Sequence, residues 1–202
     1  MGNVLIWAER QLCPTISKLK MTCVVLLFSI GIRDGKRLIM ADWREMLAEM
    51  GLQNPRTLIA TGNAIFECRG TDIAKLEARL EDAYEKRFGR RVHNIVRPAE
   101  LFRRLVGENP FPKESKKDGS KVMVRVMRQP MTKDLEATLK PYLTQGERVK
   151  IVNGDLWMHF KGSSNESKLS AALGSKRMGI GTVRNWNTVR RLGEMVDDGA
   201  QL

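Results

Sequence analysis

The stretch RTLIATGNAIFEC, residues 56–68, decides how the first half of the chain folds. Two short runs of strand-forming composition, 56–60 and 64–68, flank the tripeptide TGN. A Gly-Asn pair between two such runs is typical of a β-hairpin, because both residues tolerate the left-handed backbone that a tight turn requires. The sequence therefore predicts two neighbouring antiparallel strands here.

Helical patterns precede and follow this hairpin. Residues 40–50 place large apolar side chains on one helix face, namely Met40, Trp43, Met46, Leu47 and Met50. Gly51 then supplies a stop signal. After the hairpin, Thr71 or Asp72 is expected to cap a longer helix that runs to about Phe88.

Further strands are expected at 22–32, an apolar run, and at 91–96. The order strand-helix-strand-strand-helix-strand is that of the split βαβ, or ferredoxin-like, arrangement. The second half repeats these signals less regularly, with a strand, a helix, a hairpin, a short helix and a terminal helix expected at 121–127, 132–143, 148–160, 167–175 and from about Asn185. The predicted fold class is therefore α+β, with two ferredoxin-like units packed in tandem.

Composition changes divide the chain into four parts. Residues 1–20 show no convincing period and are expected to be a poorly ordered N-terminal extension. Residues 21–107 form the first predicted unit. The polar segment 108–120, rich in Pro, Lys and Ser, is interpreted as a linker. Residues 121–202 form the second, less regular α+β unit with a C-terminal helix.

The chain is strongly basic. Its 202 residues include 35 Lys and Arg against 23 Asp and Glu, a net charge of +12, and residues 108–202 carry 17 of the former and 11 of the latter. Such an excess attracts nucleic acid, anionic membranes or phosphorylated ligands. Because no block of five like charges occurs, an ordinary mixed surface remains the alternative.

The sequence gives little support for a metal site, a disulfide framework or membrane association. The three cysteines Cys13, Cys23 and Cys68 form no C-x-x-C pair, and neither His93 nor His159 has a metal-ligand partner at suitable spacing. We therefore expect no metal, no cofactor and a cytoplasmic location. The apolar run 22–32 is too short to span a bilayer, so no membrane partner is expected, and the oligomeric state stays open.

Two stretches are candidates for a binding site. In the first, Thr61, Gly62 and Asn63 offer a hydroxyl, an open backbone and an amide at a hairpin tip. The alternative is a turn that simply uses turn residues. Near the C-terminus, apolar residues at helical spacing, Trp186, Val189, Leu192 and Val196, predict that Trp186 is a core residue, whereas a base-stacking platform would have to point away from that stripe.

The start of this terminal helix also predicts an anion site. Asn185 and Asn187 are suited to cap the helix, and its first amides together with Arg184 favour a phosphate or carboxylate. Other basic residues are expected to add positive field, namely Lys176, Arg177, Arg190 and Arg191.

The motifs at 40–44, 61–66, 109–111, 167–169 and 184–188 resemble those of a widespread bacterial family of unknown function. This resemblance implies a tandem ferredoxin-like α+β fold and no particular activity. The chain departs from the family pattern at 28–34, where FSIGIRD replaces the usual R-G-I-N-V-G-G, and TGN replaces the commoner SGN. Residues 1–20 lie outside the resemblance.

We therefore expect an anionic ligand, with nucleic acid as the first candidate, at a site that contains Thr61, Gly62, Asn63, Ser167, Lys168, Arg184, Asn185 and Asn187. A sheet-binding mode has weak support, since Phe66, Trp157 and Phe160 are the only aromatic candidates. One alternative is an enzyme for a small phosphorylated or carboxylated metabolite, which predicts a concave pocket lined by these residues, whereas a nucleic-acid binder predicts a broad basic groove. Another is a non-catalytic interaction module, which predicts buried motif side chains bonded to the backbone.

Overall fold

The computed structural model describes residues 20–28, 38–59, 62–70, 72–144, 146–173 and 178–198. The chain divides into two compact units. Unit 1 comprises residues 1–104 and 192–202, and unit 2 comprises residues 105–191. Residues 1–19, which belong to the predicted extension, lie outside the described residues.

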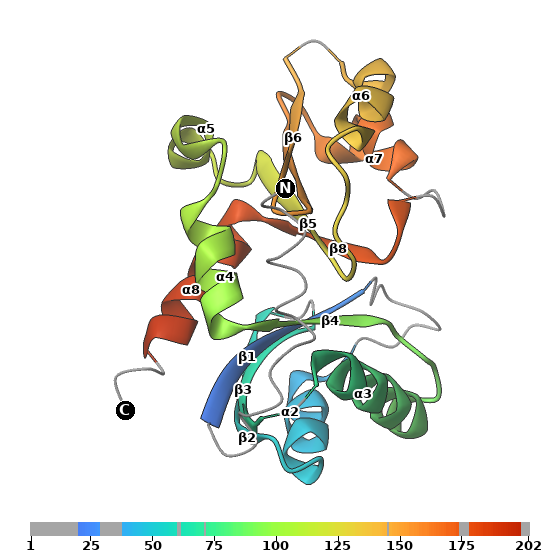
Figure 1. The fold of residues 1–202 in the computed structure, drawn as a ribbon, viewed down its shortest axis with the longest axis vertical. Coiled ribbons are helices and arrows are strands. Elements are labelled where there is room, and N and C mark those ends of the chain that lie inside the picture. The colour runs from blue at the N-terminus through green and yellow to red at the C-terminus, as the bar shows by residue number, and fades with distance from the viewer. Residues whose placement is uncertain are drawn as a thin grey trace. The chain divides into compact units, whose positions relative to one another are not determined.

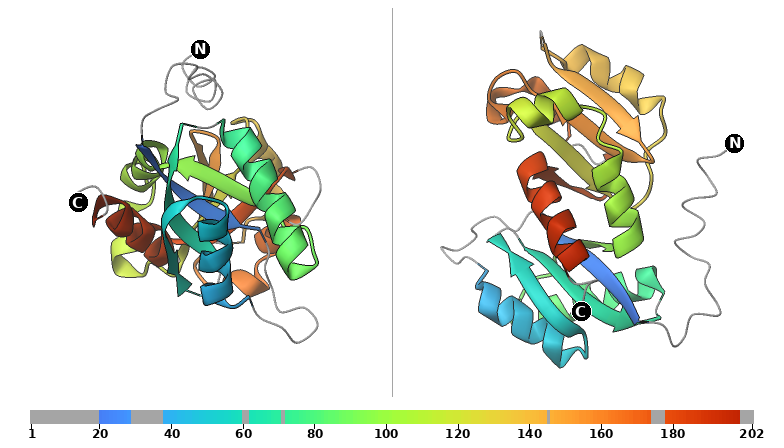
Figure 2. Two further views of the ribbon diagram at one scale, coloured as in Figure 1. Left: turned by 90° about the horizontal axis from the view of Figure 1, so that it is seen from below. Right: turned by 90° about the vertical axis from the view of Figure 1, so that its left-hand side faces the viewer.

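Unit 1 has the topology that the sequence predicts. Its elements are β1 (Lys20–Leu27), α2 (Met40–Glu49), β2 (Gln53–Leu58), β3 (Asn63–Arg69), α3 (Ile73–Phe88) and β4 (Asn94–Pro98). The four strands form an antiparallel sheet in the order β2-β3-β1-β4. Helices α2 and α3 lie on one face of this sheet (Figures 1 and 2). This is the ferredoxin-like arrangement.

Amphipathic helices explain the core of unit 1. Trp43 and Leu47 of α2 and Leu80 and Tyr84 of α3 are buried against the sheet, and the Trp43 and Tyr84 rings meet edge to face at 5.7 Å. Asp72 caps α3 by accepting hydrogen bonds from the backbone N–H groups of residues 74 and 75, as one of the two predicted caps. Thr71, the other candidate, lies outside the described residues.

Two strands of unit 1 differ from the predicted ranges. β2 begins at Gln53 rather than at residue 56, and it tolerates Pro55 because it lies at the edge of the sheet. β4 occupies 94–98 rather than 91–96, since residues 91 and 93 use their side chains to contact α3. Helix α4 (Ala99–Gly107) follows β4 directly.

Unit 2 repeats the topology of unit 1. Its elements are α5 (Pro112–Lys117), β5 (Val122–Met127), α6 (Leu135–Leu139), the 3-10 helix η2 (Lys140–Tyr142), β6 (Arg148–Val152), β7 (Asp155–His159), the 3-10 helix η3 (Ser164–Glu166), α7 (Lys168–Ala172) and β8 (Gly181–Asn185). The antiparallel sheet has the order β6-β7-β5-β8, so each strand occupies the place of its counterpart in unit 1. The two sheets with their helices confirm the predicted α+β, ferredoxin-like fold.

The helix predicted from about Asn185 is confirmed as α8 (Trp186–Asp198), whereas two other features differ from the sequence-based expectation. The strand β8 precedes this helix. The pattern GTVRN conceals this strand because it holds a single large apolar residue, Val183. Helix α5 lies inside the segment 108–120 that was interpreted as a linker.

The core of unit 2 is smaller and rich in methionine. Leu139 of α6 and Leu169 of α7 belong to one buried cluster with Met127 and Met158. The hairpin between β6 and β7 turns through Asn153 and Gly154, whose φ angles of 48° and 80° are left-handed. Throughout the part of the chain that the structure describes, the helices are too short or too polar to cross a bilayer.

Candidate functional site

The predicted hairpin residues hold the turn together. The Gly62 carbonyl accepts a hydrogen bond from the Leu27 N–H at 3.0 Å. Asn63 is fully buried, and its Nδ2 donates to the Leu58 carbonyl at 3.2 Å. Thr61 lies outside the described residues. Gly62 and Asn63 therefore stabilise the turn between β2 and β3 in unit 1 through hydrogen bonds to the backbone.

Ser167 and Lys168 lie at the start of α7 in unit 2. Ser167 is buried, and its hydroxyl caps the helix by accepting from the Leu169 N–H at 3.1 Å. Lys168 is exposed beside it. The serine therefore has a structural partner, whereas the lysine presents a charge to solvent.

Arg184, Asn185 and Asn187 are brought together where β8 passes into α8. Asn185 caps α8, because its Oδ1 accepts from the Thr188 N–H at 3.0 Å. Arg184 donates to the Thr182 hydroxyl at 2.6 Å and to the Val183 carbonyl at 2.9 Å. Burial lowers the pKa of Arg184 to about 10, so this guanidinium remains cationic at neutral pH.

A cavity of about 560 Å³ lies beside this junction, entirely within unit 2. Its walls come from the end of α4, from α5 and the residues around it, and from the first turn of α8: Val106, Gly107, Asn109, Pro112, Ser115, Lys116, Gly119, Trp186, Asn187 and Arg190. Of the residues predicted from sequence to form a site, Asn187 lines this cavity. The others that the structure describes do not.

Asn109 fixes the wall that α5 forms. Its Oδ1 accepts from the Phe111 N–H at 2.8 Å, and its Nδ2 donates to the Ser115 hydroxyl at 2.7 Å. Phe111 is buried, and the Arg148 guanidinium stacks on its ring at 5.0 Å while also pairing with Glu114. The motif NPF at 109–111 therefore holds α5 in place and leaves Lys116 at the cavity.

Gly119 allows the backbone to pass close to the start of α8. A Cβ atom at this position would lie 2.2 Å from Asn187 Oδ1 and 3.1 Å from Trp186 Cδ1. Both distances are shorter than ordinary van der Waals contacts, so a larger residue would displace the Asn187 amide. The lack of a side chain at Gly119 thus sets the shape of this wall.

Trp186 is half-buried, so the prediction that it is a core residue was wrong in part. Val189, Leu192 and Val196, which share its helical stripe, are buried as expected. Helical side chains lean toward the helix N-terminus, so that of the first residue projects beyond the end of the buried stripe. The indole packs against the buried Trp157, with ring centroids 6.1 Å apart, and also lines the cavity.

The cavity has two basic residues in its wall. Lys116 and Arg190 are exposed, and none of the lining residues that the structure describes is acidic. Arg190 was expected from the sequence to add positive field, but Lys116 and Gly119 were missed because residues 108–120 were interpreted as a linker. The NPF motif at the start of that segment is the signal that could have identified it as folded. Lys176 and Arg177 lie outside the described residues.

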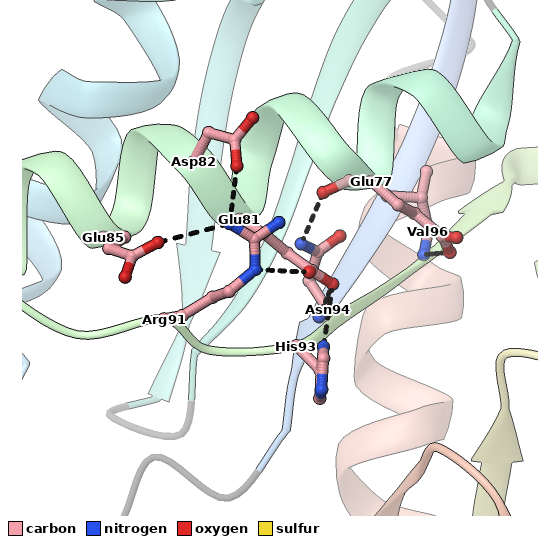
Figure 3. Close-up of polar contacts among 8 residues, drawn as sticks. All are labelled: Glu77, Glu81, Asp82, Glu85, Arg91, His93, Asn94 and Val96. Atoms are coloured by element: carbon pink, nitrogen blue, oxygen red, sulfur yellow. Dashed lines mark hydrogen bonds and ion pairs between the residues drawn. The ribbon is translucent and has the colours of Figure 1, made fainter.

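A second polar cluster lies in unit 1 between α3 and β4 (Figure 3). The buried carboxylate of Glu77 accepts from the Val96 N–H at 2.9 Å, and that of Glu81 accepts from the Asn94 N–H at 3.4 Å. β4 is an edge strand, and such a strand presents unpaired N–H groups on its outer side. The two glutamates therefore cover the edge of the sheet.

The remaining side chains of this cluster hold the glutamates in position. Glu81 contacts His93 Nδ1 at 3.2 Å and Arg91 Nε at 3.3 Å, and Arg91 also pairs with Asp82 and Glu85 (Figure 3). The pairings with Asp82 and Glu85 raise the pKa of Arg91. The carboxylates are thus used within the fold, and this cluster is structural.

Two buried cysteines of unit 1 are close but not bonded. Cys23 and Cys68 are free thiols with sulfur atoms 3.9 Å apart, and their mutual hydrogen bond raises the pKa of Cys23 and lowers that of Cys68. Cys13 lies outside the described residues. Within the described ranges, His, Cys, Asp and Glu side chains do not gather in groups of three or more that could hold a metal ion.

The fold and the cavity define a protein of two ferredoxin-like α+β units, one of which carries an open basic pocket. Residues 21–157 match the family described as protein of unknown function (DUF1697), and the chain belongs to this family. No curated protein matches the sequence. A similar solved structure is that of the conserved bacterial protein SP0830 from Streptococcus pneumoniae, with a TM-score of 0.68 and 21% identity over 88% of this chain and 99% of that chain. At this identity the likeness shows the fold alone.

Proposed function

We propose that this protein binds an anionic, phosphate-bearing ligand in the unit 2 cavity, with nucleic acid as the first candidate. The observation that carries the proposal is the lining itself: two basic side chains, Lys116 and Arg190, share a cavity with the half-buried indole of Trp186. Lysine and arginine side chains attract phosphate, and an indole offers an apolar face to the group that carries the phosphate.

The charge distribution supports the same ligand class. Unit 2 carries 17 Lys and Arg against 8 Asp and Glu, whereas unit 1 carries 18 against 15. A local excess of this size raises the concentration of anions near the surface and speeds their association. It acts on any phosphate backbone irrespective of sequence.

The residues predicted from the sequence remain part of this proposal in different ways. Asn187 offers its amide to the cavity, and Arg184 and Lys168 add positive charge to unit 2. Asn63 and Ser167 are buried and bonded to the backbone, which favours a structural role for them. The buried, backbone-bonded side chains of Asn63 and Ser167 agree with the alternative of a non-catalytic interaction module. That alternative does not account for the open cavity with basic residues in its wall.

An enzyme for a small phosphorylated metabolite is the second candidate. Its support is the cavity volume, which lies within the range typical of small-molecule sites. The lining supplies the Lys116 ammonium and the Ser115 hydroxyl but no carboxylate, imidazole or thiol. General acid–base chemistry relies chiefly on such groups, so the lining favours binding over catalysis.

A comparison of two lysines on the same helix tests the proposal. Lys116 lines the cavity, while Lys113 is also exposed on α5 and does not line it. We expect Lys116→Ala to weaken binding of single-stranded RNA or DNA and to reduce the slope of log K against log salt by about 1, as for one lost phosphate contact. Lys113→Ala, with the same change in net charge, should leave both nearly unchanged.

Arg190 and Arg191 provide a second matched pair, because both are exposed on α8 and Arg190 alone of the two lines the cavity. Equal effects within each pair would show that net charge acts without a defined site. If neither RNA nor DNA, single-stranded or duplex, binds near physiological salt, nucleic acid is excluded and small phosphorylated metabolites become the ligands to test.

A further inference from the structure

We infer that the ligand of this cavity is a nucleotide unit whose base stacks on Trp186 while its phosphate meets Lys116 and Arg190. This inference rests on the function proposed above. It adds that the ligand carries a base beside its phosphate. It starts from the unexpected position of Trp186, a large aromatic side chain that is half-buried at the wall of a basic cavity.

The contacts of the indole suit it to act as a stacking surface. It packs against Trp157, which is 1% exposed, at a centroid distance of 6.1 Å and an interplanar angle of 49°. The Asn185 side chain caps the helix that begins at Trp186 and so fixes the backbone of that residue. A ring that is already ordered loses little conformational entropy when a base stacks on it.

The cations lie where a phosphate attached to such a base can meet them. Arg190 follows Trp186 by four residues on α8, so the two side chains lie on the same face one turn apart. Lys116 reaches the same cavity from α5. Aromatic stacking combined with basic side chains is the usual way in which proteins bind single strands without sequence preference.

The same arrangement excludes a paired base. In a duplex each base is stacked on both faces and its ring is inaccessible to a protein side chain unless it is flipped out. A base that stacks on Trp186 therefore comes from a single strand or from a free nucleotide. These two sources share the chemistry of the ligand and can be separated by experiment.

The test compares four probes on the full chain: a short oligothymidylate, an abasic phosphodiester of equal length, a duplex of equal length, and thymidine monophosphate. Because stacking contributes roughly 5- to 150-fold per base, we expect the oligothymidylate to bind that much more tightly than the abasic strand. The duplex should gain no advantage over the abasic strand. Binding of thymidine monophosphate as tight as that of the oligomer would identify a free nucleotide as the ligand.

Variants of Trp186 assign the base preference to this ring. Trp186→Phe retains an aromatic face and should keep the preference, whereas Trp186→Leu retains an apolar contact without a π face and should lose it. Quenching of tryptophan emission by oligothymidylate should be present in the wild type and reduced in the Trp186→Phe variant. This readout stays informative even if the leucine variant fails to fold.

Each outcome separates the inference from the function on which it rests. Equal affinity for the thymidylate and abasic strands, with the Lys116 and Lys113 difference intact, would overturn base stacking and leave phosphate binding in place. A base preference that survives Trp186→Leu would move stacking to another residue and overturn the inference. No binding of any of the four probes would overturn the inference and exclude nucleic acid as the ligand in the proposed function.

Discussion

The two units share one topology but use their charged residues differently. In unit 1 the helix before the last strand, α3, is sixteen residues long, and its buried Glu77 and Glu81 cover the edge of β4. In unit 2 the corresponding helix α7 has five residues, none of them acidic. Unit 1 is nearly neutral, whereas unit 2 holds most of the basic excess.

This difference shows that two units with the same fold can have different roles in one protein. Acidic residues in unit 1 pair with basic ones, as in the contacts of Arg87 with Glu45 and Glu49. These contacts raise the pKa of Arg87. In unit 2, Lys116 and Arg190 line a cavity whose described lining residues include no Asp or Glu. Unit 1 thus contributes a balanced scaffold, and unit 2 carries the surface on which binding is proposed.

The largest expected effect concerns the tryptophans. Trp43 of unit 1 and Trp157 of unit 2 are fully buried, and replacing either with alanine should cost about 3–5 kcal/mol in the free energy of unfolding. Trp186→Ala should cost less than either, since this side chain is only partly buried. Urea unfolding followed by circular dichroism measures all three. If Trp186→Ala lowers the free energy of unfolding as much as Trp157→Ala does, Trp186 is a core residue after all.

The edge glutamates should give an intermediate effect. Glu77→Ala removes a buried carboxylate that accepts the Val96 N–H and should cost roughly 1.5–3 kcal/mol, with increased association through the exposed edge. Glu77→Gln keeps an acceptor and should cost less. In unit 2, Glu136 makes the corresponding contact to the Ile151 N–H at the edge strand β6, so Glu136→Ala should act in the same direction. Unfolding and light scattering are the measurements. An alanine variant as stable as the glutamine variant would contradict the edge-cover role.

The smallest effect is expected from the exposed pair Glu114–Arg148 beside the cavity wall. The Arg148 guanidinium lowers the pKa of Glu114, so this carboxylate stabilises the folded state above its ordinary pKa and loses that contribution as the pH falls through the lowered value. NMR titration of Glu114 should show the lowered pKa, and Arg148→Ala should raise this pKa toward the ordinary value of a glutamate. In unit 1, Lys20 and Asn54 lower the pKa of Glu67 in the same way. An unchanged Glu114 pKa in the Arg148 variant would refute the pairing.

Local signals were sufficient to predict much of the fold. The helix caps at Asp72 and Gly89, the stop at Gly51 and the turn at Asn153 and Gly154 all act through nearby backbone, so the sequence itself reveals them. β8 was missed because its residues form no apolar pattern of their own. The strand is defined by its pairing with β5, which lies far away in the sequence.

The candidate site was harder to predict for a related reason. The motifs that stand out in the sequence, TGN and SKL, owe their residue types to turns and caps, which is where the structure places Asn63 and Ser167. In the sequence, Lys116 is one of several lysines in a polar segment, and no motif marks it. Its place in the cavity lining depends on α5, which was not predicted. Helical periodicity also misplaced Trp186, because it defines a face of the helix but not the point along that face at which burial begins.

The close approach at Gly119 has a consequence for comparing sequences within the family. Any residue with a side chain at this place must shift Asn187 or move the backbone that passes Trp186. The identity of one small residue can therefore sort family members into those that can build this cavity wall and those that cannot. A single position, read from sequence alone, becomes a marker for which relatives to purify and compare.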